Sequence, residues 1–142
     1  MSRIRDRNTK PELIVRRLLH RLGYRFRLHA KIPITHPAAT GEKAGVRYRI
    51  ARFVKPDIVL PKYRVAVFVH GCFWHRHRGC KNCTTPTANR SFWLKKFAGN
   101  VERDHRNQKA LRKLGWKPVV LWECQIDRTG FDARLKRISD RW

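Results

Sequence analysis

Histidines and cysteines crowd one short segment of the chain. Three histidines, His70, His75 and His77, fall within eight residues, directly after an apolar run that ends at Val69. An imidazole can take a proton from an attacking water molecule at neutral pH. A lone histidine is more often structural, but three of them beside cysteines at the end of an apolar strand favour a catalytic site.

A second candidate is Asp57, which follows a proline at the head of another apolar stretch. A carboxylate there cannot go deep into a core without a partner, and alone it would be an ordinary turn residue. A turn at 61–62 changes this interpretation, because a hairpin would bring Val69 and His70 back beside Asp57. A carboxylate, a strand-end carbonyl and histidines together suit Mg²⁺, and Mg²⁺ with a histidine base suffices for phosphodiester hydrolysis.

The cysteines are candidate zinc ligands. Cys72, His77 and Cys80 form a Cys-x4-His-x2-Cys pattern, which is a typical half of a tetrahedral zinc site. Two cysteines compete for the fourth position: the short spacing to Cys80 favours Cys83, whereas Cys124 stands at the end of a later apolar strand. Reduced cysteines that bind nothing are the structural alternative.

The composition limits the partners that the chain can have. Its 142 residues suit a single domain, 1–142, and 34 Lys and Arg against 10 Asp and Glu give a net charge of +24. This charge predicts a polyanionic partner rather than a merely solvated basic surface. Nucleic acid is favoured over a membrane, because no long apolar run or dominant basic amphipathic helix is present. Residues 1–7 do not resemble a signal peptide, so a reducing compartment is expected.

Aromatic residues give a separate signal. Phe73 and Trp74 lie among the histidines, and Trp93 lies near the start of a helix rich in Lys and Arg. Exposed rings beside basic residues can wedge into stacked bases, but they can also pack in a core, and the composition leaves this open. Core packing is the preferred interpretation for Trp116 and Trp122.

Hydrophobic periodicity alternates along the chain between the helical and the strand type. This alternation predicts an α/β layered domain with a mixed central sheet. The expected helices lie between Thr9 and Gly23 and over 92–114 and 131–142; the expected strands cover 24–28, 57–60, 64–69 and 119–122, and a loop over 29–52 contains at most a short strand at 46–50.

Several longer strings resemble the very-short-patch repair (Vsr) endonuclease family. They are TKPE at the first helix, the PD pair at 56–57, HGCFWHRHRGC within 65–80, FWLKKFAGNVERD at 92–104 and LGWKPVVLWEC at 114–124. They lie between residues 9 and 124 and follow one another in family order. The resemblance implies a restriction-endonuclease-like three-layer domain with a mixed central β-sheet flanked by helices, plus a structural zinc site.

The resemblance also implies roles for individual residues. Asp57 matches the Mg²⁺-binding aspartate, the main-chain carbonyl of Val69 matches a second metal ligand, and His75 matches the general base. The supporting catalytic positions would be Glu12, His70 and Asp104. The zinc ligands would be Cys72, His77, Cys80 and Cys124. The DNA-binding residues would be Phe73, Trp74 and Trp93, which match a wedge that enters the base stack, and Lys96 and Asn100, which match contacts to base edges or phosphates.

The implied activity is a Mg²⁺-dependent nick, made in one strand 5′ of the T in a T·G mismatch, which starts very short patch repair of deaminated 5-methylcytosine. A wobble pair is loosely stacked, so wedging costs less there than at a proper pair. The implied partners are double-stranded DNA with a T·G mismatch and other mismatch-repair proteins, with no membrane. The enzyme is expected to be a monomer in the bacterial cytoplasm, associated with the nucleoid through DNA.

Two other classes of protein compete with the nickase. One is a restriction-type nuclease that cuts unmodified duplex DNA on the same fold. The other is a zinc-stabilised binding module, which Asp57, His75 and Asp104 disfavour because a plain binder needs no acidic residue in a basic groove. Compared with the family, the chain is also expected to lack the usual arm before Met1 and to have a longer link over 30–53.

Overall fold

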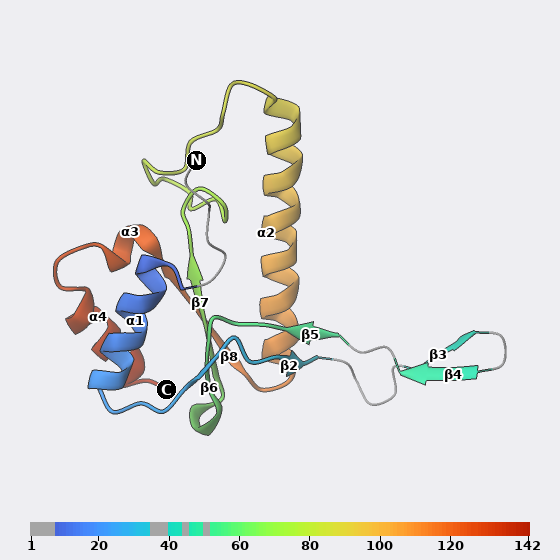
Figure 1. Ribbon diagram of the computed structural model, residues 1–142, viewed down its shortest axis with the longest axis horizontal. Helices are drawn as coiled ribbons and strands as arrows, with labels where there is room; N and C mark the ends of the chain where they lie inside the picture. Colours follow the sequence, from blue (N-terminus) through green and yellow to red (C-terminus); the bar gives the residue numbers. More distant parts are fainter. Residues whose placement is uncertain (1–7, 35–39, 44–45, 50–51) are drawn as a thin grey trace.

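A mixed four-stranded sheet lies at the centre of the computed structural model, which describes residues 8–34, 40–43, 46–49 and 52–142 (Figure 1). Its strands have the order β1-β6-β7-β8, and β7 pairs antiparallel with β6 and parallel with β8. Their bounds are Arg27–Leu28 for β1, Ile58–Leu60 for β6, Val65–His70 for β7 and Lys117–Trp122 for β8. The prediction of a mixed central sheet is confirmed.

The expected hairpin joins β6 and β7. A short 3₁₀ helix, η1 (Pro61–Tyr63), makes the turn, and Arg64 follows it with a positive φ of 53°. The register pairs Ile58 with Val67, and all of β6 is buried. Near-continuous apolar residues form these strands because helices cover both of their faces.

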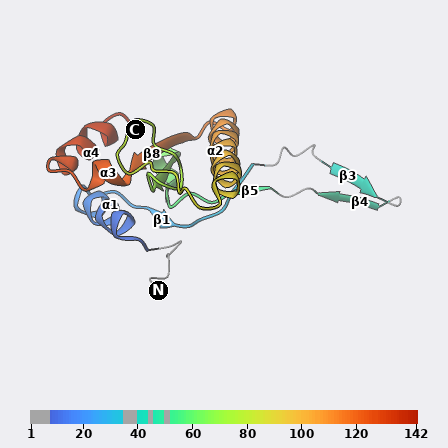
Figure 2. The ribbon, with the colours of Figure 1, turned by 90° about the horizontal axis from the view of Figure 1, so that it is seen from above.

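Helices lie on both sides of the sheet. On one side are α1 (Lys10–Arg21), α3 (Glu123–Ile126) and α4 (Phe131–Ser139), and on the other is α2 (Arg90–Lys113) (Figure 2). Successive strand residues face opposite layers. Ile58 and Val67 therefore join the core formed with α1 and α4, whereas Val59 and Ala66 join Leu111 of α2.

The segment expected to be a loop over 29–52 contains more strand than predicted. β2 (Ile32–Pro33) pairs with β5 (Phe53–Val54), and β3 (Thr40–Lys43) pairs with β4 (Val46–Arg49). The second hairpin projects from the side of the molecule (Figures 1 and 2). β4 agrees with the short strand expected at 46–50, except that residue 50 lies outside the described residues.

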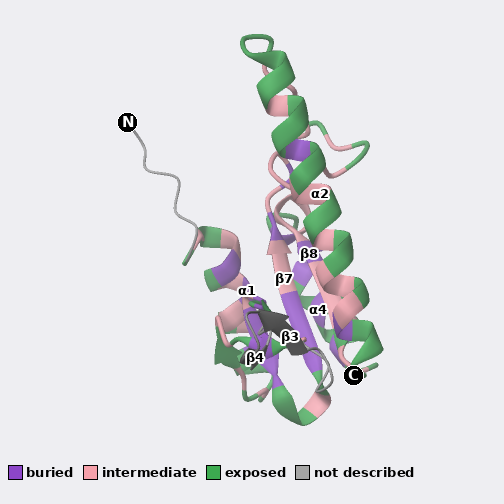
Figure 3. Ribbon diagram, turned by 90° about the vertical axis from the view of Figure 1, so that its right-hand side faces the viewer, coloured by how far each residue is buried: buried purple, intermediate pink, exposed green. Residues whose placement is uncertain are grey.

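Other expected elements have different bounds. The strand over 24–28 shortens to β1, and the last helix ends at Ser139 rather than at residue 142. The apolar positions of α2 do not form one core stripe, since Phe92 is 59% exposed and Leu94 46% exposed. Much of this helix faces solvent in Figure 3. None of the described helices is long and apolar enough to cross a membrane.

Candidate active site and metal cluster

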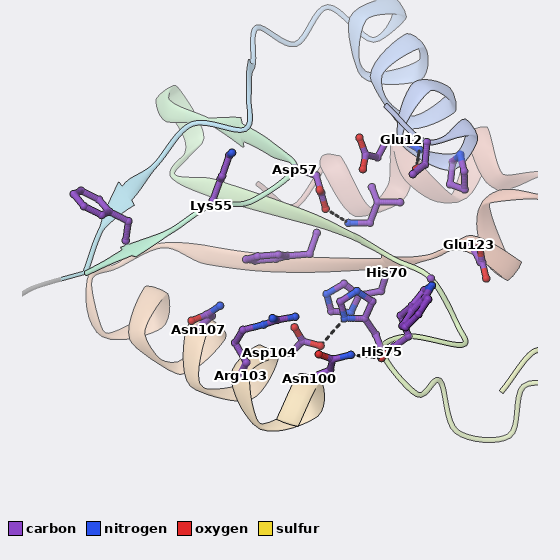
Figure 4. A pocket seen from close by; sticks show the side chains of 17 residues that line it. Glu12, Lys55, Asp57, His70, His75, Asn100, Arg103, Asp104, Asn107 and Glu123 are labelled. Atoms are coloured by element: carbon purple, nitrogen blue, oxygen red, sulfur yellow. Dashed lines mark hydrogen bonds and ion pairs between the residues drawn. The ribbon is translucent and has the colours of Figure 1, made fainter. Parts of the chain in front are cut away.

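A cleft of about 850 Å³ opens where β7 ends, between the start of α1 and the middle of α2. Figure 4 shows Glu12 and Asp57 on one side of it, and His70, His75 and Asp104 on the other. These five are the residues that the sequence predicts to be catalytic, and all of them line this one cleft. Val69, the expected second metal ligand, lines it too.

Asp57 is fixed by the β6–β7 hairpin. Its Oδ2 accepts a hydrogen bond of 2.7 Å from the backbone N–H of Val69, so the juxtaposition expected from the turn is present. Burial raises the pKa of Asp57 from 3.8 to about 6, and the nearby charge of Glu12 adds to the rise, while the Val69 hydrogen bond opposes it. The ionised carboxylate therefore lies where negative charge is poorly compensated.

Glu12 lies beside Asp57 and is only 3% exposed. Its Oε2 accepts hydrogen bonds from the backbone N–H of Asn8 at 3.0 Å and from Arg16 at 3.1 Å, and His29 Nε2 lies 3.9 Å away. Thr9 caps α1 and places Glu12 in the first turn of the helix. The capping pattern seen in the sequence thus fixes a carboxylate at the edge of the cleft.

His75 and Asp104 form a close pair on the opposite wall. The His75 Nδ1 and Asp104 Oδ2 atoms are 2.6 Å apart. Burial would raise the pKa of Asp104, but the hydrogen bond and charge of His75, with further help from His70 and Arg103, hold it below its usual value. A carboxylate at Nδ1 orients the imidazole and leaves Nε2 to accept a proton. This geometry suits a general base.

His70 packs against the His75 ring of that pair. Its ring stacks on the His75 ring, with centroids 3.9 Å apart and planes 5° from parallel. Burial, followed by the charge of His75, lowers the pKa of His70 to about 4, so its imidazole is neutral at neutral pH. Ligand atoms of His70, His75 and Asp104 come within 4.8 Å of one another. These three residues could therefore hold a metal ion as well as move a proton.

A cluster of three cysteines and a histidine lies next to the cleft. The ligand atoms of Cys72, His77, Cys80 and Cys124 all lie within 4.8 Å of one another, which allows the group to hold a metal ion. His77 Nδ1 is 3.3 Å from the sulfur of Cys124 and 3.6 Å from that of Cys72. Cys83, which the spacing alone favours, is not a member of this group.

The three aromatic residues expected to touch DNA form one cluster beside the cleft. Phe73 meets Trp74 edge to face at 5.1 Å and Trp93 at 5.8 Å, and all three side chains are half-buried. The ammonium group of Lys96 lies 5.6 Å from the Trp74 ring centre. Asn100 donates a hydrogen bond of 3.2 Å to the Trp74 carbonyl, which fastens this loop to α2. The five expected DNA-binding residues are therefore neighbours.

The sequence reasoning missed several polar residues of the cleft. Lys55, Arg103 and Asn107 line it, and Arg16 and His29 surround Glu12. A signal was present for three of them. Lys55 precedes Asp57 by two residues in extended chain, and Arg103 and Asn107 continue the helical spacing from Asn100 and Asp104. No sequence pattern pointed to Arg16 or His29.

A cleft with one buried carboxylate and one carboxylate-oriented histidine is typical of a hydrolytic enzyme. Residues 40–82 match the sequence family described as DNA mismatch endonuclease Vsr. The chain is 41% identical to the type II nicking enzyme V.XorIIP of Xanthomonas oryzae pv. oryzae, over 99% of this chain and 89% of that one. It is 40% identical to V.NmeAIP, a type II nicking enzyme of Neisseria meningitidis, over 97% and 85% of the two chains.

The Escherichia coli protein named DNA mismatch endonuclease Vsr is 44% identical over 72 residues, which are 51% of this chain and 46% of that relative. The chain therefore belongs to the Vsr family of DNA endonucleases. The family resemblance carried by the sequence motifs is confirmed.

Proposed function

We propose that this endonuclease nicks one strand of duplex DNA, 5′ of the T in a T·G mismatch that arises from deaminated 5-methylcytosine, and so starts very short patch repair. The observation that carries the proposal is the single cleft in which Asp57 faces the His75–Asp104 pair, with the aromatic cluster beside it. The net charge of +24 suits a DNA duplex.

The proposed metal ligands are the Asp57 carboxylate and the main-chain carbonyl of Val69, with Mg²⁺ as the ion. The fit rests on the carboxylate: burial and Glu12 raise its pKa to about 6, so the ionised form needs more positive charge than His75 and Arg16 supply nearby. A divalent cation supplies that charge, and oxygen donors are the ligands that Mg²⁺ prefers. When bound, it stabilises the negative charge that develops on the scissile phosphate.

The proposed general base is Nε2 of His75. It takes the proton of the water that attacks phosphorus, while Asp104 holds the ring at Nδ1 and stabilises the imidazolium that forms. His70 and Glu12 act as supporting residues: His70 packs against the base, and Glu12 keeps Arg16 at the cleft. The chain's own residues thus bind the ion on one wall and move the proton on the other.

Recognition of the mismatch is assigned to the aromatic cluster. Phe73, Trp74 and Trp93 would wedge into the stack beside the displaced pair, and Lys96 and Asn100 would hold nearby base edges or phosphates. Unstacking costs least at a mismatch, which gives the wedge its selectivity. The relative whose name includes DNA mismatch endonuclease supports this assignment.

The Cys72, His77, Cys80 and Cys124 cluster is proposed to bind structural Zn²⁺. Three thiols and an imidazole are the closed ligand set that zinc takes in structural sites. The domain, 1–142, is proposed to have the three-layer restriction-endonuclease-like fold and to act as a monomer. It would work in the bacterial cytoplasm, on the nucleoid and alongside other mismatch-repair proteins.

One assay separates the proposed activity from its alternatives. Purified protein and Mg²⁺ are incubated with a T·G duplex and with the matched duplex, each labelled on either strand, and Asp57→Ala serves as the inactive control. We expect a nick in the T strand of the mismatched duplex alone. Scission of both duplexes would instead identify a restriction-type nuclease, and binding without scission would identify a binding module.

A further inference from the structure

Trp122, the last residue of β8, lies between the metal cluster and the catalytic histidines. Its ring stacks on the His77 ring with centroids 4.3 Å apart and planes 8° from parallel. Its other contact is with the His70 ring, at 5.1 Å and 74°. His70 in turn stacks on His75 at 3.9 Å. The rings of His77, Trp122, His70 and His75 therefore form a continuous series of contacts from the cluster to the proposed base. We call this series the ring column, although its middle contact is edge to face.

The sheet itself sets this arrangement. The parallel pairing of β7 and β8 places Trp122 directly opposite His70. The next residues of the same segment also belong to the cluster region: Glu123 accepts a hydrogen bond of 3.0 Å from the Cys72 N–H, and Cys124 is itself a member of the cluster. The end of β8 thus fixes the cluster and the ring column together.

The His70 ring depends on packing for its orientation. It is 4% exposed, and its Nδ1 is buried with no hydrogen-bond partner among the described residues. Its ring neighbours are Trp122, His75 and Phe68, the last with its centroid 6.0 Å away. Without the indole, one side of the His70 ring would be open. The His70 ring, on which the His75 ring stacks, would then be free to tilt.

We propose that Trp122 is a positioning residue for the catalytic base: the indole holds His70 in place, and His70 holds the His75 ring on which hydrolysis depends. The inference rests on the proposed role of His75. It replaces the interpretation of Trp122 as a core residue, because its ring contacts are imidazoles and it is only half-buried. It also gives the cluster residue His77 a second role, since its ring stacks on the same indole.

The test measures kcat and KM for a T·G duplex. Trp122→Leu should lower kcat about 10- to 100-fold, because a small displacement of a catalytic group costs that much. KM should change less than about twofold, since Trp122 does not line the cleft. Trp122→Phe keeps an aromatic face and should recover most of the loss. A change in KM alone, or a Phe variant as slow as the Leu variant, would overturn the proposal.

Trp116→Leu is the matched control. Trp116 is also half-buried, but it stacks under Arg64 at 5.1 Å and packs on the core beneath α2, away from the ring column. We expect it to lower the melting temperature and leave kcat unchanged. If Trp116→Leu and Trp122→Leu reduce kcat equally, Trp122 only contributes to stability and the proposal fails.

A second readout needs neither DNA nor activity. NMR spectra of the DNA-free protein should show the ring protons of both His70 and His75 shifted in Trp122→Leu, the His75 signals shifted less in Trp122→Phe, and both unshifted in Trp116→Leu. Unshifted His75 signals in Trp122→Leu would overturn the proposal, and Trp122→Met takes its place in both measurements if Trp122→Leu fails to fold. If the wild type cuts no duplex while the His75 signals do shift, the proposed function fails and the ring column stands.

Discussion

The two walls of the cleft differ in the direction of the pKa shift of their carboxylates. We call the wall that carries Asp57 the strand wall, and the wall that carries Asp104 on α2 the helix wall. On the strand wall, burial and a neighbouring glutamate raise the pKa of Asp57 to about 6. On the helix wall, burial alone would raise the pKa of Asp104, but the hydrogen bond from His75 and the charge of His75 lower it. One wall carries negative charge that Arg16 and His75 compensate only in part, and the other carries a compensated pair. The contrast explains how one small cleft can bind an ion and move a proton without the two tasks interfering.

The largest effect is expected on the strand wall. Asp57→Asn should lower the nicking rate at least about 1000-fold, because the lost metal ligand supplies several kcal/mol of transition-state stabilisation. The same change should stabilise the metal-free protein at pH 7 by up to about 3 kcal/mol, the equivalent of a pKa raised from 3.8 to about 6. Single-turnover nicking and urea unfolding measure the two effects. An inactive variant that is also less stable would remove the contrast between the walls.

The matching change on the helix wall should behave differently. Asp104→Asn should lower the nicking rate about 100- to 1000-fold, within the range for general-base catalysis, because the His75 ring loses its orienting carboxylate. It should also destabilise the protein by about 1 kcal/mol, through loss of a charge-assisted hydrogen bond. The same two measurements apply. A gain in stability like that expected for Asp57→Asn would show that Asp104 is not compensated.

Loss of a ligand of the Cys72, His77, Cys80 and Cys124 cluster should lower the local stability of the helix wall and leave that of the strand wall unchanged. Cys124→Ser should release the proposed Zn²⁺ and expose the backbone amides of the loop 71–89 to hydrogen exchange, since metal binding is coupled to local folding. The β6–β7 hairpin should remain protected, because its side chains are buried in the main core. Cys83→Ser is the matched control and should retain the metal. Release of metal by Cys83→Ser instead would show that the cluster has a different fourth ligand.

The last prediction concerns the pH dependence of stability, which has no direct effect on the nicking rate. Because burial raises the pKa of Asp57 in the folded state, its protonated form stabilises the fold below a pH of about 4, and this contribution is lost as the pH rises through about 6. Metal-free wild type and Asp57→Asn should therefore be similarly stable near pH 4 and differ most above pH 7. Unfolding free energies across this range measure the difference. A constant difference at all pH values would contradict the raised pKa.

The fold was predictable where local signals were strong. The β6–β7 hairpin has two apolar runs around one turn, and α1 has both a capping residue and a helical stripe. The strand expected over 24–28 was too long for a physical reason: β1 pairs only with the short β6, and Tyr24 packs instead on Tyr63 and Trp142 at 5.3 Å. Alternating residues there reflect contact with the core rather than strand pairing.

Contacts between residues far apart in the chain could not be predicted from the sequence. The pairing of β2 with β5 joins residues about twenty apart across a stretch rich in Pro and Gly, and α3 is too short to show a helical period. In the site, the turn at 61–62 predicted the approach of Asp57 to Val69. The pairing of His75 with Asp104, 29 residues apart, follows from no spacing, and the family resemblance implied a role for each residue but not their contact.

The most direct test of the two-wall account locates the ion itself. A crystal of the Asp104→Asn variant with a T·G duplex and Mn²⁺, in place of Mg²⁺, would give an anomalous signal at each metal position. The account predicts a Mn²⁺ peak within coordination distance of the Asp57 carboxylate and of the Val69 carbonyl, with His75 unligated. A peak on His70 and His75, and none beside Asp57, would contradict it.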